Sequence, residues 1–190
     1  MKNILVAVTG GISAYKAVDV ISALKKQGYH VSAMATDSAL QFVSENVLKI
    51  TADRYWKHSW DDPVHIRATE PDQVDVFVVI PATANIMAKI RWGIADDLVS
   101  STVLALPKNT LKMMFCACNT RMWENEVVQG NFQELRLRQW RGLNPVSGML
   151  ACGTEGIGKL PPTKDIVECI NKWIKAETDL QTVNGYEKNN

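Results

Sequence analysis

Apolar residues in this chain come mostly in short continuous runs, and a polar or glycine-containing segment follows each run. The clearest runs cover residues 4–8, 31–35, 74–80 and 111–115. Runs of this length are typical of strands buried on both faces, as in the parallel sheets of α/β proteins. A weaker strand candidate covers residues 140–144, where polar residues interrupt the run. The pattern therefore predicts a buried, mostly parallel sheet.

Between these runs, apolar residues recur at the spacing of helices with one buried face. Helices are expected at about residues 14–24, 39–43, 84–92, 98–106, 123–138 and 163–174. Gly28 and Gly93 stand where the first and third of these helices should end. Ser38 can cap the second helix, and Asp96 or Asp97 the fourth. Alternating strands and helices predict an α/β protein with a doubly wound, Rossmann-like or flavodoxin-like parallel sheet.

The composition agrees with one folded domain. The chain has 190 residues, of which 46% are hydrophobic and 22% charged, enough apolar material for a full core. We expect this domain to cover residues 1–176. Residues 177–190 are polar and lack periodicity, so a disordered tail is expected there.

The charge of the chain argues against several classes of partner. A formal net charge of +1 gives no basic footprint for nucleic acid, and no Lys/Arg run indicates a membrane surface. The first apolar run is too short for a signal peptide, and no run approaches the roughly 18 apolar residues of a membrane span. We therefore expect a cytoplasmic protein that binds a small molecule.

Four cysteines indicate neither a disulfide framework nor a metal site. Cys116, Cys118, Cys152 and Cys169 are too few and too unevenly spaced for such a framework. The first two form C-x-C rather than the C-x-x-C of redox and zinc sites. No metal is expected.

In doubly wound sheets, ligands bind beyond the carboxyl ends of the strands. A glycine pair follows the first strand in Thr9-Gly-Gly-Ile-Ser13, where free N–H groups at a helix start favour an anion such as phosphate. A tight strand-to-helix turn is the simpler interpretation of these glycines. The segment lacks G-x-G-x-x-G, and no acidic residue ends the second strand, so a nicotinamide dinucleotide is disfavoured and a mononucleotide remains open.

Two further segments are candidates for the surroundings of such a site. Residues 50–70 crowd aromatic and histidine side chains into an irregular stretch, which includes His58 and His65. Taken alone, each histidine is best interpreted as an ordinary surface or core residue. Residues 148–158 hold four glycines and are expected to form a mobile loop of the kind that often covers a site.

Several segments together resemble the flavin-dependent cysteine decarboxylases. Pro81-Ala-Thr-Ala-Asn85 is similar to the P-A-S-A-N-T motif of that family, and Asn119-Thr-Arg-Met-Trp123 to its P-x-M-N-x-x-M-W motif. Residues 10–16, 65–66 and 93–98 also resemble family segments. The resemblance runs in order from about Lys2 to Trp173.

The glycine-rich loop distinguishes between branches of this family. Residues 150–159, Leu-Ala-Cys-Gly-Thr-Glu-Gly-Ile-Gly-Lys, resemble the L-A-C-G-x-x-G-x-G-R/K segment of phosphopantothenoylcysteine decarboxylases, which lantibiotic decarboxylases generally lack. Three positions depart from the family pattern. Cys116 and Cys118 replace Pro and Met, and Ile86 replaces a Thr that could contact the flavin.

The resemblance implies an activity. It is the FMN-dependent decarboxylation of (R)-4'-phosphopantothenoylcysteine to 4'-phosphopantetheine in coenzyme A biosynthesis, through transient oxidation of the thiol carbon, CO2 loss and re-reduction. It also implies a homotrimer or an assembly of trimers. His65 would be the base, Asn119 would bind the substrate carboxylate, and Cys152 would donate a proton in the reductive half-reaction. Asn119 is also suited to cap a helix, and the two roles are compatible.

The resemblance also implies two sets of binding residues. FMN would be held by Gly11, Ile12, Ser13, Thr36, Ser38, Thr83, Ala84, Asn85 and Ala117. Substrate would be held by Asn119, Met122, Ala151 and Lys159. Lys159 is the candidate for the substrate phosphate, although a solvated lysine is the simpler interpretation.

Three alternatives remain open at this point. The first is a lantibiotic-type decarboxylase that acts on a C-terminal peptidyl cysteine and yields an ene-thiol. The second is a flavin prenyltransferase, against which the 119–123 and 150–159 segments argue. The third is a regulator that keeps the flavin site without activity, which the changes at Cys116 and Cys118 would favour and an intact His65, Asn119 and Cys152 would not.

Overall fold

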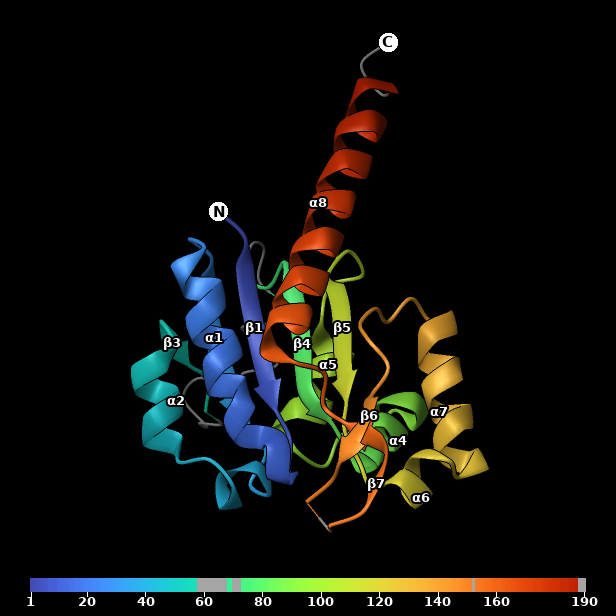
Figure 1. Cartoon of the computed structure of the whole chain (residues 1–190). Helices are drawn as coiled ribbons and strands as arrows, with labels where there is room; N and C mark the ends of the chain where they lie inside the picture. Colours follow the sequence, from blue (N-terminus) through green and yellow to red (C-terminus); the bar gives the residue numbers. More distant parts are fainter. Residues whose placement is uncertain (58–67, 70–72, 152, 188–190) are drawn as a thin grey trace.

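The structure is a computed structural model that describes residues 1–57, 68–69, 73–151 and 153–187, with side chains described up to residue 180. Its centre is a sheet of five parallel strands in the order β3-β2-β1-β4-β5 (Figure 1). The strands are β1 (Asn3–Val8), β2 (His30–Ala35), β3 (Arg54–Tyr55), β4 (Val76–Ala82) and β5 (Leu111–Cys116). The α/β class and the doubly wound parallel sheet predicted from the sequence are confirmed.

Helices cover both faces of the sheet. One layer is formed by α1 (Lys16–Lys26), α2 (Glu45–Thr51) and α8 (Thr163–Glu187), and the other by α4 (Ala84–Trp92), α5 (Leu98–Ala105) and α7 (Glu126–Leu137). Shorter elements complete the described chain: η1 (Ile12–Tyr15), η2 (Ala39–Gln41), α6 (Thr120–Trp123), β6 (Val146–Met149) and β7 (Glu155–Lys159). The last two strands form an antiparallel hairpin beside the carboxyl ends of the main strands (Figure 1).

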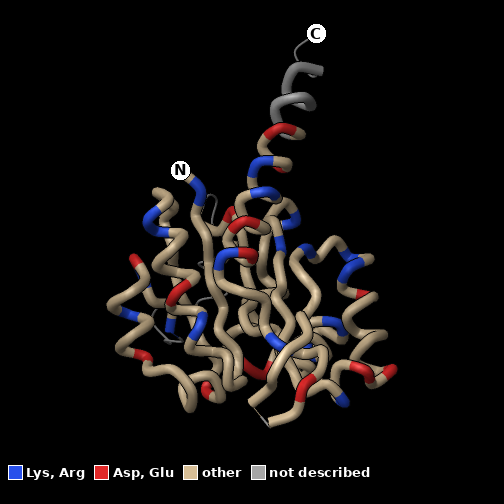
Figure 2. The backbone as a smooth tube through the Cα atoms, viewed as in Figure 1, with Lys and Arg blue, Asp and Glu red and all other residues tan. Residues whose placement is uncertain are grey.

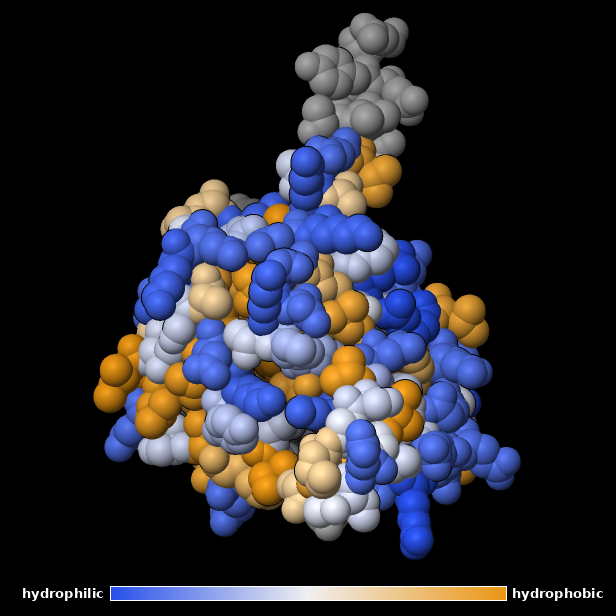
Figure 3. Space-filling view, viewed as in Figure 1, coloured by the Kyte–Doolittle hydropathy of each residue, from blue (hydrophilic) through white to orange (hydrophobic). Residues whose placement is uncertain are grey.

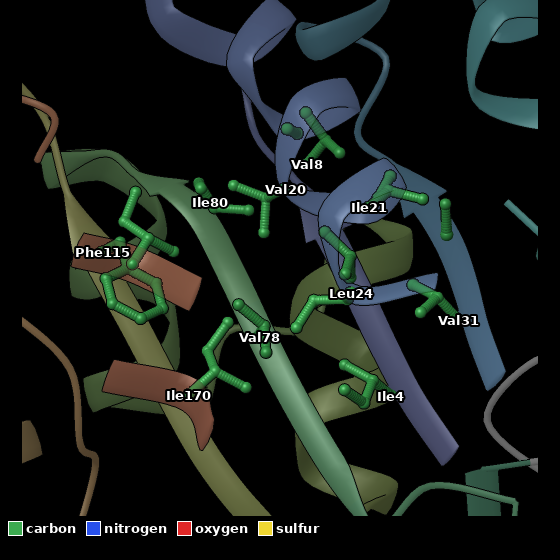
Figure 4. Packing of buried hydrophobic residues seen from close by; sticks show 14 of the residues in the cluster. Ile4, Val8, Val20, Ile21, Leu24, Val31, Val78, Ile80, Phe115 and Ile170 are labelled. Carbon is green, nitrogen blue, oxygen red and sulfur yellow. The ribbon is translucent and has the colours of Figure 1, made fainter. Parts of the chain in front are cut away.

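The side chains of β1 show why the sheet is buried on both faces. Ile4, Val6 and Val8 point into the core beneath α1, α2 and α8, and Figure 4 shows Ile4 and Val8 packed with Ile21 and other helix residues. The alternate residues of the strand lie in the second core, with α4, α5 and α7. Each fully buried aliphatic side chain of this kind contributes about 1.5–3 kcal/mol to the free energy of unfolding.

The chain changes direction between β1 and β4. From β1, α1 leads outward to β2 on one face of the sheet, whereas from β4, α4 and α5 lead to β5 on the opposite face. The two crossovers diverge, so a crevice opens at the carboxyl ends of β1 and β4. This switch point is the usual ligand site of doubly wound sheets.

Several predicted elements match closely and others differ for local reasons. Helix α4 spans the predicted residues, and Gly93 ends it in the left-handed region at φ 70°. The helix predicted at residues 39–43 is only the short η2, and its cap is the Thr36 hydroxyl, which accepts from the Ala39 N–H at 3.2 Å; Ser38 makes no side-chain cap bond. Helix α2 was not predicted; Leu48 is its one buried residue, so its sequence shows no apolar face.

The region after β5 differs more. The helix predicted at residues 123–138 corresponds to α7, and the short α6, which was not predicted, precedes it; each has an asparagine N-cap. The weak strand candidate at residues 140–144 makes a single parallel bridge, from Arg141 to Met113. Gly142 lies so close to β5 that a Cβ atom there would come within 2.0 Å of the Met114 carbonyl oxygen.

Two segments that the sequence suggested to be irregular have regular secondary structure. The glycine-rich stretch is largely the β6–β7 hairpin rather than an open loop. The chain beyond residue 176 is not irregular either, because α8 continues as helix to Glu187 and projects beyond the sheet (Figure 1). The predicted aromatic segment lies mostly outside the described residues, and His58 and His65 belong to that part.

Basic and acidic residues are interspersed in the view of Figure 2, in keeping with the formal net charge of +1. Within the described part of the chain, no helix is both long enough and apolar enough to cross a membrane.

Candidate functional site

A cavity of about 990 Å³ lies at the switch point of the sheet. The ends of β1, β2, β4 and β5 line it, and the β6–β7 hairpin adds a further wall. Figure 3 shows the face of the molecule hollowed near its centre, in the region where Figure 1 places the start of α1 and the hairpin. A cavity of this size accommodates a cofactor together with part of a substrate, because ligand pockets commonly measure about 300–1,000 Å³.

The glycine pair after β1 forms the first wall. A Cβ atom at Gly10 would come within 2.4 Å of the Ser38 hydroxyl oxygen, so the absence of a side chain lets β1 and β2 end side by side. Gly11 precedes η1, which runs directly into α1. The first N–H groups of such a helix have no partner within it, and they favour a bound anion.

A hydroxyl group ties this wall to the end of β4. Thr9 is buried, and its hydroxyl donates to the carbonyl of Pro81. The same oxygen lies 3.5 Å from the Thr83 hydroxyl oxygen. Thr83 in turn caps α4 by accepting from the Ile86 N–H at 3.3 Å. The backbone at the ends of β1 and β4 is therefore held at a defined spacing.

Helix α4 carries the second wall. Asn85 in its first turn is exposed, whereas Ile86 is almost fully buried in the core beneath. Replacement of a family Thr by Ile86 thus places an apolar side chain where the helix meets both core and cavity. One turn beyond Asn85, Lys89 also faces the cavity.

The Lys89 ammonium is held by two carboxylates. Its Nζ lies 2.7 Å from an Asp96 oxygen and 2.8 Å from an Asp97 oxygen. The hydrogen bonds that Lys89 donates to these carboxylates raise its pKa. Burial by itself would raise the pKa of Asp97, but the bonds from Lys89 and the Ser100 N–H outweigh it and lower that pKa. Asp97 and Ser100 also form a capping box at the start of α5.

Asn119 opens the third wall, after β5. Its side-chain oxygen accepts from the Arg121 N–H at 2.9 Å and caps α6. The residue is exposed and lines the cavity, as does Met122 one turn later. The cap fixes the plane of the amide, so one side chain both starts the helix and faces the cavity.

The hairpin closes this wall through close backbone packing. The Cys118 N–H donates to the Gly158 carbonyl at 3.0 Å. A Cβ atom at Gly158 would come within 2.1 Å of the Cys118 carbonyl oxygen, and one at Gly156 within 2.3 Å of the Thr120 hydroxyl oxygen. Glycine at both positions therefore allows β7 to lie directly against residues 118–120.

The two cysteines of the C-x-C segment have different surroundings. Cys116 is fully buried and its sulfur lies 3.5 Å from the Met87 sulfur, so it packs as a small apolar residue, and burial raises its pKa. Cys118 is half-buried and lines the cavity. Burial raises its pKa to about 11, which keeps it a neutral thiol near pH 7.

Every described residue that the sequence assigned to cofactor or substrate lines this cavity. These residues are Gly11, Ile12, Ser13, Thr36, Ser38, Thr83, Ala84, Asn85, Ala117, Asn119, Met122, Ala151 and Lys159. His65 and Cys152 lie outside the described residues. Their predicted roles therefore stay predictions.

Sequence reasoning missed several lining residues. The main additions are Thr9, Tyr15, Lys16, Lys89, Asp97 and Cys118. Lys89 could have been found, because it stands four residues after Asn85 and so on the same face of the helix. Lys16 follows the glycine turn directly, but a lysine there is equally suited to solvent.

The lining chemistry fits a flavin mononucleotide. The hydroxyl residues Thr9, Ser13, Thr36 and Ser38 line the cavity together with the glycine turn, which leads into a helix, and this combination suits a phosphate ester. Small and apolar residues, among them Ile12, Ala84, Ala117 and Met122, line other parts of the cavity and suit a flat ring. Among the described residues, no group of three or more His, Cys, Asp or Glu side chains could hold a metal ion.

Comparison with known proteins supports this interpretation of the cavity. A probable phosphopantothenoylcysteine decarboxylase of Streptococcus mutans is 37% identical over 181 residues, which cover 91% of this chain and 99% of that protein. The coenzyme A biosynthesis bifunctional protein CoaBC of Bacillus subtilis is 33% identical over 183 residues. That match covers 93% of this chain but only 44% of the longer relative.

A solved structure shares the fold. It is that of a PPC decarboxylase mutant complexed with pantothenoylaminoethenethiol, with a TM-score of 0.81 and 24% identity over 92% of this chain and 98% of the other. The sequence profile of the Flavoprotein family matches residues 1–175, which include all the described walls of the cavity. The chain therefore belongs to the Flavoprotein family.

Proposed function

We propose that this protein is an FMN-dependent decarboxylase that converts (R)-4'-phosphopantothenoylcysteine to 4'-phosphopantetheine and CO2 in coenzyme A biosynthesis. One observation carries the proposal. The glycine turn, the Thr83–Asn85 segment, the Asn119–Met122 segment and the hairpin are far apart in the sequence, yet they line a single cavity. The similarity to the S. mutans relative over nearly the whole of both chains supports it.

FMN would lie along the first two walls. Gly11, Ile12 and Ser13 would hold the phosphate through backbone N–H groups, together with the hydroxyls of Thr36 and Ser38. Thr83, Ala84, Asn85 and Ala117 would hold the ring and ribityl chain. Bound FMN would supply hydride acceptance and return, which make loss of the carboxylate feasible.

Asn119 would bind the substrate carboxylate. Its side-chain oxygen already caps α6, so the amide is held in a fixed plane at the cavity wall. A neutral donor suits this reaction, because decarboxylation removes the carboxylate charge. A cation in the same place would stabilise the ground state more than the transition state.

Two proposed catalytic residues lie outside the described residues. His65 would accept a proton during oxidation of the substrate, since imidazole titrates near neutral pH. Cys152 would donate a proton when the ene-thiol is reduced to the saturated product.

His65→Asn should keep bound FMN and release no CO2. Cys152→Ser should release CO2 and accumulate the ene-thiol, as judged by mass spectrometry.

We also propose that the protein assembles as a trimer or a multiple of trimers. Large apolar side chains are exposed on the layer formed by α4, α5 and α7: Trp92 is 68% exposed, Leu104 57% and Val127 62%. Surfaces of this kind often contact another subunit. Native mass spectrometry should give three chains or a multiple of three, and a monomer would contradict the proposed assembly.

The function is tested by mixing the purified protein anaerobically with phosphopantothenoylcysteine. Transient bleaching of the flavin absorbance together with 4'-phosphopantetheine is the expected result. A yellow protein that is inert with this substrate but decarboxylates cysteine-terminated peptides would favour the lantibiotic-type alternative. A colourless protein that cannot be reconstituted with FMN would overturn the proposal.

Asn119→Asp isolates the proposed contact with the carboxylate. Aspartate keeps the oxygen that caps α6 and loses the amide donor. The melting temperature should therefore stay near that of the wild type, while kcat/KM should fall by about 100-fold or more, because a charge-assisted hydrogen bond is replaced by repulsion. Asn125→Asp, the same change at the exposed N-cap of α7, is the matched control. Full activity of Asn119→Asp would contradict the proposed contact between Asn119 and the substrate carboxylate.

A further inference from the structure

Two lysines line the cavity from different walls and have no partner of opposite charge among the described residues. Lys16 is the first residue of α1, and Lys159 is the last residue of β7. Neither forms an ion pair within the part of the chain that the structure describes. They differ in this respect from Lys89, whose charge is matched by Asp96 and Asp97.

The backbone places these lysines beside the ends of different strands of the sheet. Lys16 follows the turn after β1, and Lys159 follows Gly158, which is bonded to Cys118 just beyond β5. The ends of β1 and β5 are separated by β4, hence by two strand spacings of about 10 Å in all. Two lysine side chains extended from walls at that distance can reach a single anionic group between them.

The hairpin restricts the direction of the Lys159 side chain. A Cβ atom at Gly148 would lie 3.3 Å from the Lys159 Cδ and 3.5 Å from its Nζ. The lysine therefore lies across β6 at a residue without a side chain. Substitution of Gly148 would disturb the lysine as well as the strand, since Gly148 has φ 153°.

The remaining charges of the cavity leave these lysines in excess. Apart from Lys89 and Asp97, which pair with each other, the other charged residue among the described lining is Asp37. Asp37 is exposed and follows β2, which lies on the far side of β1 from β4 and β5. The region between α1 and the hairpin is therefore cationic, which suits a phosphate dianion.

We propose that Lys16 and Lys159 together bind the phosphomonoester of the substrate and so select a phosphorylated small molecule over a cysteine-terminated peptide. This inference rests on the proposed decarboxylase function and names the residues that would select the substrate. The cofactor phosphate is the other phosphate monoester that this chemistry could recognise. The experiment must therefore distinguish the two sources.

The test uses Lys16→Gln, Lys159→Gln and the double variant of the FMN-loaded protein. Binding of 4'-phosphopantetheine and of pantetheine, which lacks the phosphate, is measured by calorimetry. The wild type should prefer the phosphorylated ligand. Each substitution should lower the affinity for 4'-phosphopantetheine by about tenfold or more, because a hydrogen bond to a charged group typically contributes such a factor. The affinity for pantetheine should stay nearly unchanged. Raised salt should reduce the preference of the wild type.

Lys26→Gln is the matched control, since Lys26 is an exposed lysine at the other end of α1 and outside the cavity. It should change neither affinity. Equal affinity of the wild type for the two ligands would overturn the proposal. An equal loss of affinity for both ligands in the variants would overturn it as well. Weaker FMN binding in Lys16→Gln would overturn it differently, by assigning that lysine to the cofactor phosphate.

Turnover separates this proposal from the proposed function. If the wild type releases no CO2 from the phosphorylated substrate but still prefers the phosphorylated ligand, the decarboxylase assignment fails and the lysine site stands. If it releases CO2 equally well from the phosphorylated and dephosphorylated substrates and binds both products equally, the lysine site fails and the decarboxylase assignment stands.

Discussion

The cavity divides into two regions that are built in different ways: a turn region, formed by the first two walls, and a hairpin region, formed by the third. The wall at the ends of β1 and β4 consists of strand-to-helix turns, in which Thr9 and Thr83 link neighbouring segments. The wall beyond β5 consists of a hairpin laid against residues 118–120 through Gly156 and Gly158. The turn region is a direct continuation of the sheet, and the hairpin region is added to it by packing.

This difference predicts which substitutions damage each wall. The turn region shares its hydrogen bonds with the sheet and helices, so loss of one bond should cost little more than that bond. The hairpin region depends on backbone surfaces that touch over a few atoms. A single added methyl group there should separate the hairpin from β5, because packed backbone cannot move aside as a flexible side chain can.

The largest effect is expected for Gly158→Ala. The new Cβ would meet a backbone oxygen at 2.1 Å, and φ is 144°, a conformation that side chains rarely adopt. Strain and overpacking together should lower the free energy of unfolding by roughly 3 kcal/mol or more, or detach the hairpin and abolish substrate binding. Chemical denaturation and substrate titration measure the two outcomes.

Gly153→Ala is the control for this prediction. Its φ is also positive, at 79°, but no atom lies within 4 Å of the added Cβ. Only the backbone strain of about 1–2 kcal/mol should remain. If both variants lose the same stability, packing against Cys118 is not what holds the hairpin.

The next effect is expected at Gly10, on the first wall. Gly10→Ala would bring a Cβ within 2.4 Å of the Ser38 hydroxyl oxygen and should destabilise the protein by about 1–3 kcal/mol. Gly11→Ala should be tolerated by the fold, because its nearest neighbours would lie at 3.5 and 3.6 Å. Addition of Ser38→Gly to Gly10→Ala should recover most of the lost stability in thermal denaturation. No recovery would contradict this account of the turn.

A smaller effect, dependent on pH, is expected for Asp97→Asn. Asparagine still caps α5 but loses the ion pair with Lys89, so stability at neutral pH should fall by about 1 kcal/mol. The folded pKa of Asp97 is lowered relative to the unfolded value of about 3.9. The contribution of the carboxylate is therefore present above about pH 4 and is lost as the pH falls through the folded pKa.

Denaturation curves at pH 7 and in acid check this prediction. The difference between wild type and Asp97→Asn should shrink as the pH decreases below about 4. Asp96→Asn is the control, because the Asp96 side chain is 59% exposed and its pair with Lys89 is solvated. A difference for Asp97→Asn that does not depend on pH would show that the ion pair contributes nothing.

The smallest effect is expected for Thr83→Ala, which removes the N-cap of α4. Loss of the bond from the Ile86 N–H should cost about 1 kcal/mol of stability. Thr83→Ser keeps the hydroxyl and should behave like the wild type in thermal denaturation. If alanine and serine destabilise equally, the methyl group rather than the cap is what matters at this position.

Prediction from the sequence succeeded where the signal is local. The apolar runs specified the main strands, and the boundaries of α4 were predicted to the residue because Gly93 ends the helix in the left-handed region. Asn119 was recognised as a capping residue for the same reason, since a cap depends on residues within one turn. The residues that the family resemblance implied around the cofactor line one cavity, because their segments follow strands that end at the same edge of a sheet.

Prediction failed where the partners are distant in the sequence. The glycines at 156 and 158 were interpreted as flexibility, whereas they allow the hairpin to contact residues 118–120. Lys89 and Lys16 were not expected in the cavity, and the Lys89 ion pairs depend on how α5 returns beside α4.

The sequence by itself therefore determined the strands, most helix ends and the edge of the sheet at which a ligand binds. Hydrophobic periodicity and capping act within a few residues and can be recognised without a partner. The tertiary structure alone decided the hairpin wall, the pairing of Lys89 with Asp96 and Asp97, and the presence of Lys16 in the same cavity as Lys159. A contact between distant segments depends on the shape and charge of both surfaces. The sequence of one segment does not specify the surface of the other.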